Sequence, residues 1–205
     1  MKALLMKDYY MSMQECRRFA LVSLIFIPIG ILTNQVFWLL WPSYMVGLMP
    51  YVLMSYEEQC AWPLYAETMP YGRAMIVKEK YLFMLINAVA CTVVMTMICA
   101  IVSAVGYLDA GIGEIIVIGL WGCTLPGCIM MPIVFKLGVA KAKLAYSVTV
   151  GCLAAITGIM AGSDGAIQSF LPGDAMMLPV TLLVAAGLFW GSCQLSIRFY
   201  MKKEL

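Results

Sequence analysis

Residues 81–108 read YLFMLINAVACTVVMTMICAIVSAVGYL and contain no charged side chain. A helix needs about 20 apolar residues to cross the ~30 Å hydrocarbon core of a bilayer, so this run predicts one transmembrane helix. Three further charge-free runs each fit one crossing, and they are 115–135, 144–163 and 175–197. A fifth run, 19–56, is too long for one crossing, and its most polar point is Thr33-Asn34-Gln35. We therefore expect two helices there, joined by a tight turn.

The sequence thus predicts an all-α membrane protein with six spans, at about 19–33, 36–56, 81–106, 115–135, 144–162 and 175–197. The composition agrees, because 63% of the residues are hydrophobic and only 12% are charged, whereas soluble domains carry about 25% charge. The first long apolar run leads directly into another span, so no signal peptide is expected. Arg17-Arg18 is interpreted as a juxtamembrane anchor and not as a twin-arginine signal.

All thirteen lysines and arginines fall on one side of this pattern, in the segments 1–18, 57–80, 136–143 and 198–205. The other side has no basic residue and consists of the segments 33–36, 107–114 and 164–174. Lys and Arg accumulate in the cytoplasmic flanks of membrane spans. Both termini are therefore predicted to be cytoplasmic, in a multi-pass arrangement.

The first of these basic segments mixes apolar and charged side chains. In residues 1–18, apolar Leu5 and Tyr9 alternate with charged Lys7 and Glu15. Such a pattern is typical of an amphipathic helix lying in the membrane interface. A frayed tail is the alternative.

The loop 57–80 is the only sizeable predicted cytoplasmic segment between spans, and it is too apolar for a flexible linker. Pro63, Pro70 and Gly72 divide it into short pieces. From Ala74 onward the chain runs without a helix breaker into the third span. This loop is either a docking element for a protein partner or an aromatic belt at the level of the headgroups.

Two further motifs concern packing. Gly158-x-x-x-Gly162 lies in the fifth predicted span and Gly187-x-x-x-Gly191 in the sixth. Small residues at this spacing let helices approach closely, either within one bundle or between subunits. Six of the eight cysteines lie in predicted spans, where Cys acts as a small hydrophobic residue.

Several kinds of chemistry have no basis in the sequence. No Asp, Glu, His or Lys lies inside a predicted span, which disfavours proton-driven transport. The chain has no histidine, the usual general base and zinc ligand, and no Cys-x-x-Cys pair. It also has no Gly-x-x-x-x-Gly-Lys loop to hold a nucleotide. We expect no catalytic, cofactor or metal site and no nucleic-acid partner, so energy for any transport must come from another protein.

Ordered motifs along the whole chain carry a family resemblance. The chain opens with Met1-Lys2-Ala3-Leu4-Leu5-Met6-Lys7-Asp8. Later motifs are Tyr56-Glu57-Glu58, Trp62, Tyr65, Met69-Pro70, Arg73, Ile76-Val77, Lys80-Tyr81-Leu82, Pro132 to Gly138, and Lys141-Ala142-Lys143. In order and spacing these motifs resemble the small permease subunits of bacterial ABC-2 type transporters. Pro63 inside the Trp-x-x-Tyr motif and Tyr71-Gly72 depart from the family pattern.

The resemblance implies a role for each cytoplasmic segment. Residues 1–18 would be an elbow helix, and 57–72 would contain a coupling helix that fits a cleft in a separate ABC ATPase. The implied ATPase-coupling residues are Glu57, Glu58, Trp62, Tyr65, Met69 and Arg73. The implied partners are that ATPase, which would bind ATP and Mg²⁺, and a second permease, identical or paralogous. The implied location is the bacterial cell membrane.

The favoured hypothesis is therefore the permease subunit of an ATP-driven exporter of amphipathic or antimicrobial peptides or other hydrophobic substrates. A second hypothesis is an ATP-independent membrane scaffold or immunity protein that binds a peptide. A secondary transporter is a third hypothesis, which the absence of acids from the predicted spans disfavours.

Overall fold

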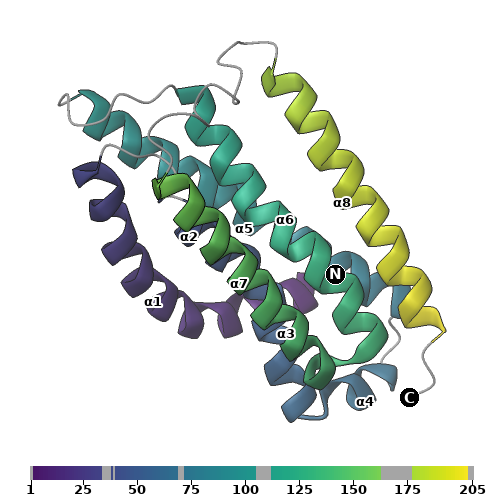
Figure 1. Ribbon diagram of the computed structural model, residues 1–205. Coiled ribbons are helices and arrows are strands. Elements are labelled where there is room, and N and C mark those ends of the chain that lie inside the picture. Colours follow the sequence, from purple (N-terminus) through teal and green to yellow (C-terminus); the bar gives the residue numbers. More distant parts are fainter. Residues whose placement is uncertain are drawn as a thin grey trace.

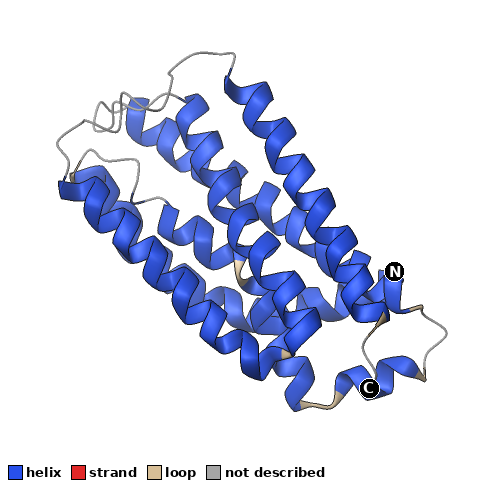
Figure 2. Ribbon diagram, turned by 45° about the vertical axis from the view of Figure 1, so that its right-hand side comes forward, coloured by secondary structure: helices blue, strands red, loops and turns tan. Residues whose placement is uncertain are grey.

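The computed structural model describes residues 2–33, 38, 40–68, 72–104, 112–162 and 177–202. The described elements are helices, namely α1 (Lys2–Leu32), α2 (Leu40–Gly47), α3 (Met49–Gln59), α4 (Trp62–Glu67), α5 (Arg73–Ala104), α6 (Ile112–Leu137), α7 (Val139–Gly162) and α8 (Met177–Met201). No strand occurs among the residues that the structure describes (Figure 2). The all-α prediction is confirmed. Residues 34–36 of the predicted turn, residues 107–111 and the whole of 164–174 fall outside the described residues.

Helix α6 lies at the centre of the bundle and packs against α2, α5, α7 and α8 (Figure 1). On one face, Met131 and Phe135 contact α5 and α8. On another, Met130 and Val134 contact α2, α3 and α7. The helix is therefore apolar on more than one face, as expected for a helix surrounded by others.

Three helical segments are long and apolar enough to cross a membrane, namely Arg73–Ser103, Ile115–Leu137 and Leu182–Met201. They correspond to the third, fourth and sixth predicted spans. Much of their outer surface is apolar, with Val93 and Met97 of α5 and Leu183 of α8 more than half exposed. Hydrocarbon is a suitable environment for such side chains.

Helix α1 differs from the expected separate elbow helix and first span. It is one uninterrupted helix from Lys2 to Leu32. The sequence offers no reason for a break at residue 18, because its first Gly or Pro is Pro28. Figure 1 shows a curved ribbon whose purple N-terminal turns run across the bundle and whose later turns rise along one side.

The second predicted span, 36–56, also differs from the single helix expected. The structure has two helices, α2 and α3, with a turn at Leu48 between them. Pro50 has no N–H, so the carbonyl of Val46 loses its helical partner. At the end of α2, the N–H of Leu48 donates to the carbonyls of both Tyr44 and Met45, each at 3.1 Å, so the chain tightens into a turn there. Helix α3 then continues to Gln59, beyond the predicted end of the span.

Close approach between helices depends on glycines that the sequence motifs did not include. A Cβ atom on Gly122 would lie 2.6 Å from the Cβ of Ser43, and one on Gly47 would lie 2.7 Å from Cγ of Pro126. Ser43-x-x-x-Gly47 on α2 therefore packs directly on α6. By contrast, a Cβ on Gly187 or Gly191 of α8 would meet no atom of the described chain within 4 Å.

The predicted packing motifs thus do not mediate close packing within this chain where the structure describes their surroundings. A Cβ atom on Gly187 or Gly191 would have no neighbour within 4 Å, so these glycines make no close contact with another described helix. Gly158 and Gly162 lie in the last turns of α7, and their surroundings are outside the description. Contact with a second subunit stays a prediction for both pairs.

Candidate functional site

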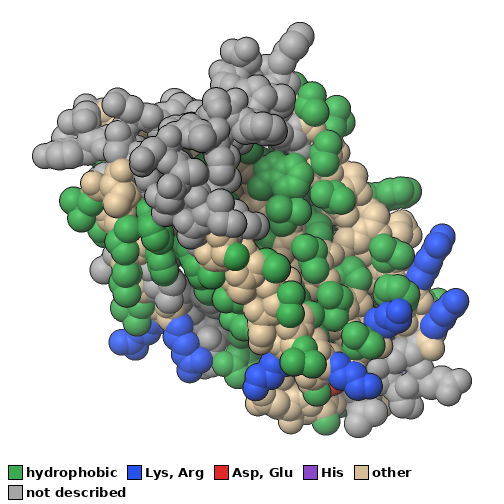
Figure 3. Space-filling model, in the orientation of Figure 1, with side chains coloured by type: hydrophobic (Ala, Val, Ile, Leu, Met, Phe, Trp, Pro, Cys, Tyr) green, Lys and Arg blue, Asp and Glu red, His purple; other side chains and the backbone are tan. Residues whose placement is uncertain are grey.

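The region around α4 combines most of the candidate residues at one end of the bundle. Helix α4 follows α3 after a short turn and lies at the bottom of Figure 1. The described lysine and arginine side chains also gather along the lower and lower-right edges of the molecule (Figure 3). We call this region the α4 end.

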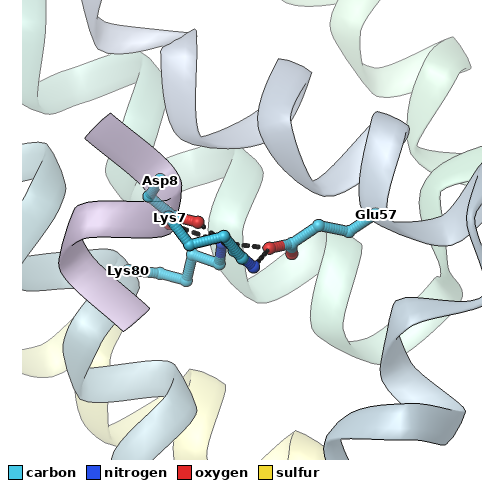
Figure 4. A network of polar contacts seen from close by, with 4 residues as sticks. All are labelled: Lys7, Asp8, Glu57 and Lys80. Atoms are coloured by element: carbon cyan, nitrogen blue, oxygen red, sulfur yellow. Dashed lines mark hydrogen bonds and ion pairs between the residues drawn. The ribbon is translucent and has the colours of Figure 1, made fainter. Parts of the chain in front are cut away.

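Glu57 is the most heavily connected of the predicted coupling residues. It lies near the end of α3 and is 7% exposed. Its Oε1 accepts a hydrogen bond from Nζ of Lys80 at 2.7 Å and is also ion-paired with Lys7. The Lys80 ammonium donates a second bond, at 2.5 Å, to Oδ2 of Asp8 (Figure 4). One carboxylate of α3 thus joins α1 and α5.

Burial makes this network energetically important. Lys80 is 2% exposed and Asp8 is fully buried. A charge removed from water is tolerated when opposite charges and hydrogen bonds surround it, and it is costly when it is alone. These ion pairs link α1, α3 and α5, so loss of one partner would leave a buried charge without compensation.

Glu58 points to a different part of the bundle. Its Oε2 accepts a hydrogen bond from the N–H of Val139 at 3.1 Å, at the first residue of α7. The preceding residue, Gly138, has φ of 79° and forms the sharp turn between α6 and α7. Glu58 therefore satisfies one of the unpaired N–H groups at the start of α7. Adjacent acidic residues of α3 thus bind different helices, Glu57 binding α1 and α5 and Glu58 binding α7.

Trp62 and Tyr65 lie on α4 itself. The Lys7 ammonium lies 4.1 Å from the centre of the Trp62 ring, a cation–π contact. The rings of Trp62 and Tyr65 are 5.5 Å apart, and Tyr65 is 56% exposed. Pro63 fits the first turn of α4, where its missing N–H has no intrahelical partner to lose. The departure from the Trp-x-x-Tyr pattern is thus compatible with a short helix.

The other two predicted coupling residues are less informative. Arg73 is the first residue of α5 and makes an interaction within the described chain. Met69 lies outside the described residues, as do Pro70 and Tyr71.

A cavity of about 330 Å³ lies behind α4. It is lined by residues from six helices, α3 to α8, and by the Gly138 turn, among them Glu57, Glu58, Trp62, Lys80, Phe135 and Tyr200. Among the residues that the structure describes, no group of three or more Cys, Asp or Glu side chains is arranged to hold a metal ion.

Comparison with known proteins decides the family. The model of the ABC-2 family transporter proteins matches residues 3–201. The chain belongs to the ABC-2 transporter family. No curated protein and no solved structure matched it in the corresponding searches.

As a member of that family, the chain is a membrane-embedded permease component of an ABC transporter and works with an ABC ATPase. The resemblance of its motifs to this family, stated from the sequence, is confirmed. The ABC-2 permease brings four of its six predicted coupling residues, Glu57, Glu58, Trp62 and Tyr65, to its α4 end.

Of the five residues in or beside the permease's ion network, sequence reasoning assigned a coupling role to Glu57 alone. Lys7, Asp8 and Lys80 entered it only as orientation signals or as parts of a family motif, and Glu79, which is 1% exposed, was not singled out. A signal was present. Lys7-Asp8 and Glu79-Lys80 each place opposite charges next to each other in the sequence, whereas an amphipathic surface helix keeps its charges on the face opposite its apolar stripe.

Proposed function

We propose that this permease is part of an ATP-driven exporter in which α4 receives the movement of the ABC ATPase. The observation that carries this proposal is the pair Glu57–Glu58 at the end of α3. Glu57 is bound to α1 and α5, and Glu58 is bound to the start of α7. A displacement of α4 and the end of α3 would therefore reach three other helices through two neighbouring side chains.

The orientation of the permease follows from the same end of the molecule. We propose that the α4 end is cytoplasmic, because the described basic side chains gather there (Figure 3). Six crossings with both termini inside would account for the charge pattern, with α1 and the α2–α3 pair as the first two spans and α7 as the fifth. The ATPase, with its ATP and Mg²⁺, would bind the exposed part of α4, and the permease itself would have no catalytic site.

Amphipathic or antimicrobial peptides, or other hydrophobic compounds, are the substrate class that we propose. The apolar outer faces of α5 and α8 and the scarcity of charge in the bundle suit molecules that partition into the bilayer. A second permease, identical or paralogous, would complete the pathway in the bacterial cell membrane. The open glycines Gly187 and Gly191 on α8 support a contact between subunits.

The coupling proposal is tested with the permease and the ATPase encoded beside it, co-expressed and reconstituted in nanodiscs. The double substitution Trp62→Ala and Tyr65→Ala should abolish the stimulation of ATP hydrolysis by the permease. Tyr65→Ala alone should weaken it, because Tyr65 is the exposed ring. The matched control is Ile101→Ala, which removes a large apolar side chain that is 65% exposed on α5, away from the α4 end and from the glycines of α8.

If stimulation is unchanged in a correctly folded double variant, α4 is not the coupling element. If no ABC ATPase co-purifies with the wild-type permease, the exporter proposal itself fails. The alternative function is an ATP-independent scaffold or immunity protein that sequesters a peptide. Peptide resistance that persists in cells carrying an ATPase unable to hydrolyse ATP would favour this alternative.

A further inference from the structure

The charges buried at the α4 end do not balance. Three acidic residues, Asp8, Glu57 and Glu79, lie in or beside the ion network. The network contains two lysines, Lys7 and Lys80. With every group ionised, the set carries one negative charge in excess. Asp8 is fully buried and Glu79 is 1% exposed, so water does not compensate for this excess.

The hydrogen bonds show where the excess lies. The ammonium group of Lys80 donates one hydrogen bond to Glu57 and one to Asp8. Oε1 of Glu79 is buried and has no hydrogen-bond partner in the described chain. Oδ1 of Asp8 also lacks a hydrogen bond, although Nζ of Lys7 lies 3.3 Å away. Neither described lysine of the network forms an ion pair with Glu79. A buried carboxyl group that has no cation bound to it is more stable in its neutral, protonated form.

We infer that Glu79 binds one proton in the folded protein, which leaves the buried set with two ammonium groups and two carboxylates. Burial without a bound cation favours the neutral form of this carboxyl group. Glu79 is adjacent to Lys80, whose bond to Asp8 joins α1 to α5 near the start of α5. Loss of the proton would leave an uncompensated negative charge in this joint and would loosen it. The α4 end is thereby sensitive to pH.

The charged groups that face Glu79 come from more than one helix. Lys80 is on the same helix, and Asp8 and Lys7 come from α1. Glu57 of α3 competes with Asp8 for the Lys80 ammonium. The two lysines of the network are already paired with other acids, Lys7 with Asp8 and Glu57, and Lys80 with the same two residues. The proton is thus the missing positive charge.

Infrared spectroscopy of the full-length permease in nanodiscs tests this inference directly. At neutral pH the spectrum should show the C=O stretching band of a buried protonated carboxyl group, with the shift in D₂O that identifies it. Glu79→Gln should remove the band. The matched control, Glu58→Gln, removes an exposed carboxylate and should leave the band unchanged. Absence of the band in the wild-type protein overturns the inference without any variant, and so does a band that survives Glu79→Gln.

The dependence of stability on pH gives a second test. The folded protein holds a proton at Glu79 that the unfolded chain releases near the ordinary pKa of glutamate, about 4.3, so stability must decrease as the pH rises above that value. The unfolding equilibrium constant of the wild type should increase by up to about tenfold per pH unit while the folded protein still holds this proton, and it should level off once Glu79 ionises in the folded protein. Glu79→Gln carries no ionisable group at this site and should show a flatter profile, whereas Glu58→Gln should follow the wild type. Parallel profiles for the wild type and Glu79→Gln would contradict the inference. Both tests are independent of the ATPase, so they can fail while the proposed function holds.

Discussion

Glu57 and Glu58 are neighbours in the sequence, yet their side chains serve different helices. Glu57 is buried and shares two lysines with Asp8. Glu58 is exposed and binds the backbone at the start of α7. The sequence indicated that both residues matter, through the family resemblance, but it did not distinguish a buried ion pair from a helix cap. That distinction depends on which helices are adjacent in space, and local pattern carries no such information.

Lys80→Met should strongly destabilise the protein. It removes the donor that Asp8 and Glu57 share and leaves two buried carboxylates poorly paired. Breaking a buried ion pair from one side costs about 3–5 kcal/mol, and the loss is measured as the free energy of unfolding in nanodiscs. The control Lys78→Met changes an exposed lysine two residues away and should have little effect. The triple variant Lys80→Met, Asp8→Asn, Glu57→Gln should recover part of the loss. A Lys80→Met protein as stable as Lys78→Met would show that the ion network does not hold α1, α3 and α5 together.

At the scale of elements, long charge-free runs predicted helices well. The runs beginning at residues 81, 115 and 175 correspond to α5, α6 and α8, because a strongly apolar run has a helix as its main option in a bilayer. The interruption at Leu48 was not predicted, although Pro50 lies beside it. A proline in a membrane helix produces anything from a small kink to a complete turn, and the contacts of α2 with α6 decide between these outcomes.

Gly47→Ala should weaken the contact between α2 and α6. The added Cβ would collide with the backbone of Cys123 and with Pro126, and a backbone group cannot turn aside as a flexible side chain can. Forcing one extra carbon into a packed region costs about 1–3 kcal/mol, measured as a decrease in the free energy of unfolding. Gly151→Ala on α7 is the matched control, since its Cβ would meet nothing within 4 Å, and it should be neutral or slightly stabilising. Equal effects of the two substitutions would exclude the close α2–α6 contact.

For the whole molecule, the distribution of charge along the sequence predicts an orientation in the membrane. The basic residues that the sequence assigned to one side lie at one end of the bundle where the structure describes them (Figure 3). The pairing of helices was beyond the sequence. Gly187-x-x-x-Gly191 appeared suited to internal packing but is open, while Ser43-x-x-x-Gly47 is the pair that forms a close seam. Both motifs permit close approach between helices. Only Ser43-x-x-x-Gly47 faces a matching surface, which is the part of α6 around Gly122 and Cys123.

Thiol labelling in intact cells tests the orientation. Cys60 is exposed at the α4 end, in the turn before α4. A membrane-impermeant maleimide should label it only after the cells are permeabilised, if this end is cytoplasmic. In a background with Cys60→Ser, a cysteine placed by Ala110→Cys in the predicted outer loop should react without permeabilisation. Labelling of Cys60 from outside would reverse the proposed topology.

The turn at Leu48 has a mechanical consequence for how force travels in this permease. Helix α2 is fixed to α6 at Gly47, immediately before the turn, and α3, with 11 residues, begins immediately after it. At about 1.5 Å per residue, α3 is a lever roughly 16 Å long. Its far end carries Glu57, Glu58 and α4, and its near end pivots on a turn that lacks one helical hydrogen bond. In the coupling that we propose, a push on α4 would tilt α3 about the Leu48 turn while α2 stays fixed to α6, so that a small displacement outside the bilayer would become a sideways movement of α3 within it.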